Sequence, residues 1–135
     1  MNAHELLSKA FGGSGYDIAC AQHDTSILYR IEGGVSSVNE IDLKLPFVNQ
    51  LYFIYLNKKQ NSRDAIAAYR EKVVDKTILA HQISVITNQM IACNNISDFE
   101  HLIVQHEQLL SKALDTPTVK SKLFSDYKGA IKSLG

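Results

Sequence analysis

Residues 26–45 have the pattern of two strands, and the second of them alternates apolar and polar positions with a period of two. SILYRIE at 26–32 is predicted to form one strand, and Gly33-Gly34 after it predicts a turn. Residues 35–45 are predicted to form a second, half-exposed strand, which Pro46 ends. Its apolar positions alternate with Asp42 and Lys44 and are Ile41, Leu43 and Leu45. The two strands are expected to pair as a hairpin.

A continuous apolar run, QLYFIYLNK at 50–58, follows the predicted hairpin. Strands that are buried on both faces read as such runs rather than as alternating patterns. The run therefore predicts a central strand. Its aromatic side chains, Tyr52, Phe53 and Tyr55, are expected in the core.

The remaining pattern follows the helical period, with a residue suited to capping before most segments. Asn61 or Ser62 is predicted to cap 63–74, and Asp75 to cap 76–93. Ser97 and Glu100 form a capping-box pattern before 99–114. Short helices are predicted at 3–11, at 17–23 and from Thr116-Pro117, and the tail 128–135 is the possible start of a strand.

Two of the predicted helices carry a clear apolar stripe. In 76–93 the stripe is Leu79, Ile83, Ile86 and Met90. In 99–114 it is Phe99, Leu102, Ile103, His106, Leu109, Leu110 and Ala113, and the position of His106 predicts a packed core histidine. Strands and helices are segregated along the chain, which predicts an α+β fold.

Composition describes an ordinary globular chain of 135 residues, with 45% hydrophobic and 21% charged residues. Basic and acidic residues balance at 14 each, so charge predicts neither a nucleic-acid nor a membrane partner. Cys20 and Cys93 lie far apart, which predicts reduced thiols. No secretory signal is visible, so a cytoplasmic location is expected.

Several kinds of site are excluded by spacing. The five histidines show no metal-ligand pattern, since His101 and His106 are five residues apart. Tyr16 stands where the nucleophile elbow around Ser14 would need its second glycine, which excludes a serine hydrolase. The Rossmann glycine pattern is incomplete, and a Walker loop is absent.

GGSGYD at 12–17 is the one stretch that leaves a functional hypothesis open. A glycine-rich turn lets backbone N–H groups approach a ligand, and a carboxylate just after it is held in a fixed place. On spacing alone, the other interpretation is a tight turn with Asp17 as the cap of the following helix.

The segment GGSGYDIACAQHDTSILYRI, 12–31, resembles the part of GHMP-family small-molecule kinases that carries their active-site aspartate. The string GYDIA resembles one branch of that family, and Ser14 to Asp17 resemble the phosphomevalonate kinase version of the motif. QLYFIYLNKKQNSRDAI, 50–66, resembles the strand, loop and helix that open the family's C-terminal domain. KGAIKSLG, 128–135, resembles the approach to its last glycine-rich motif.

The resemblance implies a partial GHMP kinase fold, mainly the ferredoxin-like C-terminal domain. Residues 1–45 would be the end of the N-terminal domain and 46–135 a truncated C-terminal domain. Asp17 would be catalytic, either as the base that takes the acceptor's proton or as the charge that orients the acceptor. Gly13, Ser14 and Gly15 would shape the acceptor pocket, and Ser62 and Arg63 would contact the acceptor or its phosphate.

The implied enzyme transfers the ATP γ-phosphoryl group to mevalonate, phosphomevalonate or a similar small acid in isoprenoid biosynthesis. The family's glycine- and serine-rich phosphate loop is absent from the sequence, and no residue reads as a Mg²⁺ ligand. ATP and Mg²⁺ are therefore expected in a full-length parent and not on this fragment, which alone is expected to be inactive.

The alternative hypothesis is a non-catalytic binding or oligomerisation module that retains the fold. An incomplete domain exposes apolar edges, which predicts a homodimer or an exchange of elements with a neighbour.

Overall fold

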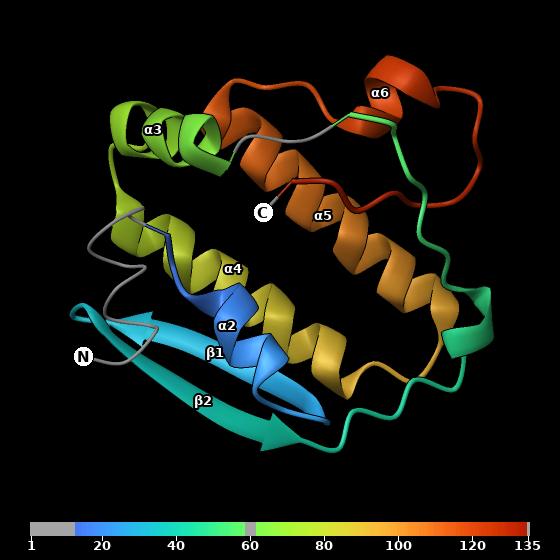
Figure 1. Ribbon diagram of the computed structural model, residues 1–135. Helices are drawn as coiled ribbons and strands as arrows, with labels where there is room; N and C mark the ends of the chain where they lie inside the picture. Colours follow the sequence, from blue (N-terminus) through green and yellow to red (C-terminus); the bar gives the residue numbers. More distant parts are fainter. Residues whose placement is uncertain (1–12, 59–61, 135) are drawn as a thin grey trace. The chain divides into compact units, whose positions relative to one another are not determined.

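The computed structural model describes residues 13–58 and 62–134 (Figure 1). It is of mixed helix and strand content, as the predicted α+β class requires. The chain divides into two compact units, Met1–Lys44 and Leu45–Gly135. The predicted helix at 3–11 lies outside the described residues. None of the helices in the described ranges is both long and apolar enough to cross a membrane.

The first unit contains helix α2, Tyr16–Ala21, and a hairpin of β1, Ser26–Glu32, with β2, Val35–Ile41. The strands pair antiparallel in the register Glu32↔Val35 to Ser26↔Ile41, so the predicted hairpin is confirmed. Its two-residue turn, Gly33-Gly34, has positive φ at both positions, 56° and 80°, which is the type I′ pattern that suits the strand twist. α2 lies against β1, with Ala19 buried between them.

β2 ends four residues earlier than predicted, at Ile41, so Pro46 does not end it. The exposure of residues 41–45 still alternates, with Ile41, Leu43 and Leu45 half-buried. The alternating pattern therefore identified which of these residues are half-buried, but the residues after Ile41 do not pair as a strand.

The second unit consists of helices and extended segments. Its helices are η1, Val48–Gln50, α3, Ser62–Lys72, α4, Lys76–Ala92, α5, Ile96–Leu114, and α6, Val119–Leu123. α5 contacts both α3 and α4. The core cluster lies where they meet and is formed by Val73, Leu79, Leu110 and Leu134, with Tyr69, Ile83, Leu109, Ala113 and Leu114 packed around it.

Most helix predictions agree with the structure. Asp75 caps α4, because its Oδ1 accepts a 2.9 Å hydrogen bond from the Ile78 amide. The apolar stripe of α4 is buried or half-buried, as is the stripe of α5, which includes the buried His106. Phe99, at the start of the α5 stripe, packs on the buried Phe47 with ring centroids 5.0 Å apart.

Two helix starts were predicted wrongly. Asn95, not Ser97, caps α5, and its Oδ1 accepts a 2.9 Å hydrogen bond from the Asp98 amide. Asn95 is an equally good cap residue that comes earlier in the chain. α6 begins at Val119 after the cap Thr118, two residues later than the predicted start at Pro117. Ser62 begins α3 and is therefore not its cap, while Asn61 lies outside the described residues.

The predicted central strand is wrong. Residues 51–56 form neither a helix nor a strand, and the single sheet in the described ranges contains only β1 and β2. Tyr52, Phe53 and Tyr55 are 82%, 107% and 84% exposed, so they are not core residues. A continuous apolar run becomes a central strand only where neighbouring strands and helices cover it, and none in the second unit does.

Candidate functional site

The glycine turn, Gly13–Asp17, leads directly into α2. Gly15 is the residue before the helix and has φ 78° and ψ 5°, in the left-handed region. Its carbonyl accepts the first helical hydrogen bond, from the Ala19 amide at 3.0 Å. Glycine adopts this conformation without the steric penalty that a Cβ atom brings. A glycine at position 15 therefore allows the chain to begin α2 from a left-handed residue.

Asp17 is the second residue of α2, and its side chain is exposed. The interpretation of Asp17 as the helix cap is wrong, because Gly15 holds that position and no side chain caps the helix. Within the described residues, no hydrogen bond or ion pair engages the Asp17 carboxylate. The carboxylate is therefore exposed on the first turn of α2.

Two tyrosines hold the glycine turn against the hairpin. The Tyr29 hydroxyl, on β1, donates a 2.6 Å hydrogen bond to the Ser14 carbonyl. The rings of Tyr16 and Tyr29 meet edge to face, with centroids 5.9 Å apart and an interplanar angle of 68°. The Tyr16 amide also donates a long, 3.4 Å bond to Ser14 Oγ. Ser14 is thus engaged through both its carbonyl and its hydroxyl.

The sequence did not single out Tyr16 or Tyr29 as site residues. The only available signal was that each is an aromatic residue beside the glycine turn or in the strand that follows it. The sequence does not predict a contact between Tyr29 and Ser14, because α2 and a loop whose conformation the sequence does not specify lie between them.

The surroundings of the Tyr16 phenol raise the pKa of Tyr16. Its hydrogen bond with the Cys20 side chain, one helical turn later, raises the pKa of Tyr16, and partial burial and the Cys20 charge raise it further. Both Cys20 and Cys93 are free. At the other end of α2, His23 Nδ1 lies 2.7 Å from the Ala19 carbonyl oxygen, a hydrogen bond in which the ring nitrogen is the donor.

The remaining predicted acceptor contacts, Ser62 and Arg63, are the first two residues of α3, in the second unit. Their side chains lie outside the described part of the structure. Gly13, Ser14, Gly15 and Asp17 lie together in the first unit. A shared role of the two groups at one acceptor therefore stays a prediction.

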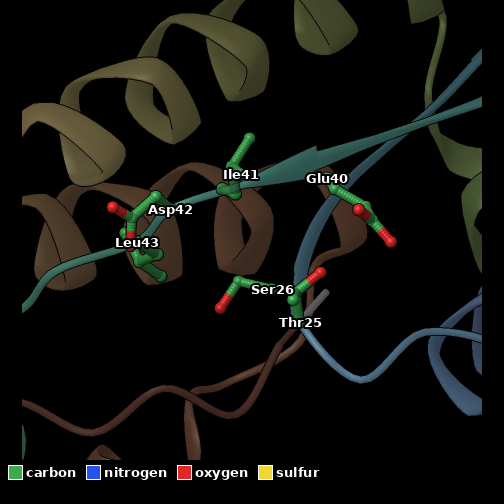
Figure 2. Close-up of a pocket in the computed structure, with 6 residues that line it drawn as sticks. All are labelled: Thr25, Ser26, Glu40, Ile41, Asp42 and Leu43. Carbon is green, nitrogen blue, oxygen red and sulfur yellow. The ribbon is translucent and has the colours of Figure 1, made fainter.

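The open end of the hairpin carries a shallow hollow of about 470 Å³. Figure 2 shows its lining residues, which come from the start of β1 with the residue before it and from the end of β2 with the two residues after it: Thr25, Ser26, Glu40, Ile41, Asp42 and Leu43. The carboxylates of Glu40 and Asp42 point to opposite sides of Ile41, and Asp42 pairs with Lys44 at 2.8 Å. The two carboxylates do not converge, and no residue of the glycine turn lines the hollow.

In the described ranges, no three His, Cys, Asp or Glu side chains gather in a way that would hold a metal ion. A second hollow, of about 390 Å³, lies in the second unit between the start of α4 and the end of α5. It also contains none of the predicted site residues.

A buried polar cluster lies along α5 and holds the final extended segment of the chain, residues 129–134. Figure 1 shows this segment beside α5. The Glu107 carboxylate, 4% exposed, accepts hydrogen bonds from the amides of Ser133 and Leu134 at 2.9 and 2.8 Å and from the Ser133 hydroxyl at 2.6 Å. Glu100 accepts another from the Ala130 amide at 3.2 Å.

Lys132 and His106 complete this cluster. Lys132 Nζ lies 3.5 Å from Glu107 Oε1 and donates to the Leu134 carbonyl. The Lys132 side chain is 40% exposed, and its partial burial lowers the pKa of Lys132 while Glu107 opposes the shift. Burial and then the Lys132 charge lower the pKa of His106 to about 4, against the opposing effect of Glu107. The Glu107 carboxylate is satisfied by the amides and hydroxyl of residues 133 and 134, whereas His106 Nδ1 is buried without a hydrogen-bond partner among the described residues. The contacts of Glu107 dock the final segment on α5.

Comparison of the chain with protein-family models, with curated proteins and with solved structures found no match.

Proposed function

We propose that this chain carries the acceptor-binding part of a small-molecule kinase of the GHMP type, with Asp17 as the carboxylate that faces the acceptor. The observation that carries the proposal is the placement of Asp17. Its exposed carboxylate follows the left-handed Gly15 by two residues, on a turn that Tyr29 ties to β1. This is the rigid support that a catalytic carboxylate needs, because misplacement by about 1 Å lowers rates strongly.

In the proposed enzyme, ATP supplies a γ-phosphoryl group to a hydroxyl or phosphate oxygen of a small acid. The acceptor oxygen forms a bond to the γ-phosphorus while the bond from that phosphorus to the leaving ADP oxygen breaks. Asp17 orients the acceptor and, where the acceptor is a hydroxyl, takes its proton. The backbone of Gly13, Ser14 and Gly15 lines the acceptor pocket, and Ser62 and Arg63 contact the acceptor or its phosphate.

The residues present do not fit an ATP and Mg²⁺ site. The sequence contains no glycine- and serine-rich phosphate loop, and the described residues include no cluster of carboxylates for a cation. The proposal therefore gives this chain the acceptor side of the reaction only. We expect these 135 residues alone to phosphorylate no small acid, and turnover by them would contradict the proposal.

The test begins with the coding sequence on both sides of these 135 residues. The proposal expects an open frame with a phosphate loop before them and a glycine-rich motif after them, and a product that phosphorylates mevalonate, phosphomevalonate or a similar acid. Asp17→Ala in that product should lower kcat by about 10²–10⁴-fold, the usual contribution of a positioned acid or base. Asp24→Ala, another exposed carboxylate of the first unit, is the matched control and should leave kcat unchanged.

In-frame stops on both sides would overturn the kinase proposal, as would an unchanged rate in Asp17→Ala. The second candidate would then be a non-catalytic module that associates with other chains. The observation that favours it is the exposed apolar surface at residues 51–56, where Tyr52, Phe53 and Tyr55 are each more than four-fifths exposed.

A further inference from the structure

The final segment, residues 129–134, lies on α5 and is bound there through its own backbone (Figure 1). Glu107 Oε1 accepts hydrogen bonds from the amides of Ser133 and Leu134 at 2.9 and 2.8 Å, and Oε2 accepts one from the Ser133 hydroxyl at 2.6 Å. The carboxylate is 4% exposed, and a buried charge is stable only where polar groups satisfy it. One buried carboxylate therefore binds two consecutive amides and a serine hydroxyl.

Glu100 gives a second attachment point on α5. Its carboxylate accepts a 3.2 Å hydrogen bond from the Ala130 amide. Glu100 lies two helical turns before Glu107, which is about 10.5 Å along the helix axis. A nearly extended chain covers about 10 Å in three residues, the separation of Ala130 and Ser133. The spacing of the two carboxylates therefore matches the spacing of the amides in a peptide backbone that runs along the helix.

The Leu134 side chain adds an apolar anchor. It is 8% exposed and packs in the core cluster, whose other buried members come from α4, α5 and the residue after α3. The acceptors and the apolar recess thus belong to α3–α5, and the donors and the anchor belong to the final segment. We call this site the α5 dock, and its residues are Val73, Leu79, Glu100, Glu107 and Leu110.

The chain beyond α5 is attached to the final segment rather than to the other helices. In the described ranges, α6 makes at most slight contact with the other helices. It is bonded to the final segment, since Lys120 Nζ donates a 2.7 Å hydrogen bond to the Gly129 carbonyl. The connection from α5, residues 115–117, is exposed. Residues 118–134 are therefore one unit that the α5 dock holds in place.

The α5 dock does not distinguish the chain's own final segment from that of a second copy. One contiguous segment supplies all the donors and the leucine, so the same segment of another molecule makes the same contacts. Exchange of an identical element between copies is a low-cost route to association for this reason. We propose that the α5 dock is a peptide-binding site that takes residues 129–134 of a second copy in place of the chain's own. This inference does not depend on the kinase proposal.

The chain's own segment has the advantage at ordinary protein concentrations. A short connection gives a tethered segment an effective concentration of about 1 mM. At about 10 µM, the segment of a second copy therefore competes at a disadvantage of about 100-fold. The wild-type chain should remain a monomer of 15.0 kDa at that concentration. Binding in trans becomes measurable once the chain's own segment is prevented from docking.

Leu134→Asp frees the α5 dock, because it places a charge where the apolar anchor was. A fluorescein-labelled peptide of residues 128–135, KGAIKSLG, measures binding in trans by fluorescence anisotropy. The Leu134→Asp chain should bind this peptide at least about 100-fold more tightly than the wild-type chain, whose own segment competes. Leu123→Asp, at a 62% exposed leucine of α6, is the matched control and should behave as the wild type.

A second change in the Leu134→Asp chain shows whether the peptide occupies the α5 dock. Glu107→Ala removes the acceptor of three hydrogen bonds and should weaken peptide binding by at least about 10-fold. Glu71→Ala, at an exposed acid of α3, is the control in the same background and should leave binding unchanged. A peptide with aspartate in place of its leucine should not bind.

A mixture of two variants tests the second copy as the partner. The Glu107→Ala chain keeps the final segment and lacks the dock, whereas the Leu134→Asp chain keeps the dock and lacks the anchor. By sedimentation velocity, each variant alone should run as a monomer. An equal mixture, at a concentration above the Kd of the peptide, should contain a species of twice the 15.0 kDa mass.

Three results would overturn the proposal. The first is no peptide binding by a Leu134→Asp chain that has the wild-type helix content by far-ultraviolet circular dichroism. The second is binding that Glu107→Ala does not weaken, and the third is a mixture that stays monomeric although the peptide binds. If Leu134→Asp lowers the helix content, Ser133→Pro takes its place with the same expected results, because it removes an amide donor to Glu107 without placing a charge in the core.

Discussion

The Tyr29 hydroxyl lies 2.6 Å from the Ser14 carbonyl oxygen, to which it donates a hydrogen bond across 15 residues of chain. This bond joins the middle of β1 to the backbone of the glycine turn. Helical hydrogen bonds fix the turn on one side, through the Gly15 carbonyl, and Tyr29 fixes it on the other. The backbone of the turn that precedes Asp17 is therefore attached to a strand residue that is distant from it in sequence.

Tyr29→Phe tests this attachment, because it removes the hydroxyl and keeps the ring beside Tyr16. The bond is exposed, so its loss should lower the free energy of unfolding by no more than about 1 kcal/mol. The main effect should be local, with faster amide hydrogen exchange at residues 14–16. Tyr127→Phe, a half-exposed tyrosine of the second unit, is the matched control. Unchanged exchange at the turn in Tyr29→Phe would contradict the attachment.

Gly15→Ala should disturb the turn through the backbone itself. Alanine at φ 78° brings its Cβ atom close to the following carbonyl, which costs about 1–2 kcal/mol. Gly13→Ala is a close control, since Gly13 has no positive φ and an added Cβ atom there meets nothing within 4 Å. Thermal or urea unfolding should show a loss for Gly15→Ala alone. Equal stabilities would mean that the left-handed conformation is not maintained in solution.

The sequence predicted those features whose signals are local. Gly33-Gly34 between two alternating runs was sufficient for the hairpin and its turn. Asp75, just before a helical period, was sufficient for the α4 cap. In the candidate site, the glycine turn and Asp17 were recognisable because they are contiguous.

Features that depend on distant contacts were not predictable. Glu100 looked like part of a capping box, yet its carboxylate accepts a hydrogen bond from Ala130, 30 residues later. The apolar run LYFIYL could be a buried strand or an exposed segment, and the sequence pattern is the same in both cases. The exposure of its side chains was therefore not predictable from the pattern. The Tyr29 bond to Ser14 was missed for the same reason, because its existence depends on how α2 and β1 pack.

Glu107→Gln tests how the final segment is docked. The buried Glu107 Oε1 accepts hydrogen bonds from the amides of Ser133 and Leu134, and Oε2 accepts one from the Ser133 hydroxyl. Glutamine keeps one acceptor oxygen for the two amides but removes the charge, and its amide nitrogen cannot accept the bond from the hydroxyl. Hydrogen bonds to a charged group contribute about 1.5–3 kcal/mol each at most, so a net loss of about 2 kcal/mol in unfolding free energy is expected. Urea unfolding measures it.

Glu71→Gln is the control for Glu107→Gln, since Glu71 is an exposed acid of α3. It should change stability by less than about 0.5 kcal/mol. Hydrogen exchange adds a local readout, because amides 133 and 134 would bond to a neutral amide oxygen in Glu107→Gln, a weaker acceptor than a carboxylate, and should exchange faster. If both amides stayed protected, the docking contact would have to lie elsewhere.

His106 predicts a loss of stability in mild acid. Its folded pKa is about 4, lowered by burial and by Lys132, whereas an unfolded histidine titrates near about 6.5. Between these values the unfolded chain binds a proton that the folded chain does not, so stability must fall as the pH falls from about 6.5 to about 4. A pKa difference of this size between the folded and unfolded states corresponds to a change of about 3 kcal/mol at most in the free energy of unfolding.

His106→Leu should remove that part of the pH dependence. At pH 7 the variant should be at least as stable as the wild type, because His106 Nδ1 is buried with no hydrogen-bond partner among the described residues. Urea unfolding at pH 7, 5.5 and about 4.5 measures the difference between the two proteins, in which the other titrating groups cancel. His101→Gln, at an exposed histidine of the same helix, should keep the wild-type slope. If His106→Leu lost stability in acid as steeply as the wild type, His106 would not be the group that carries the effect.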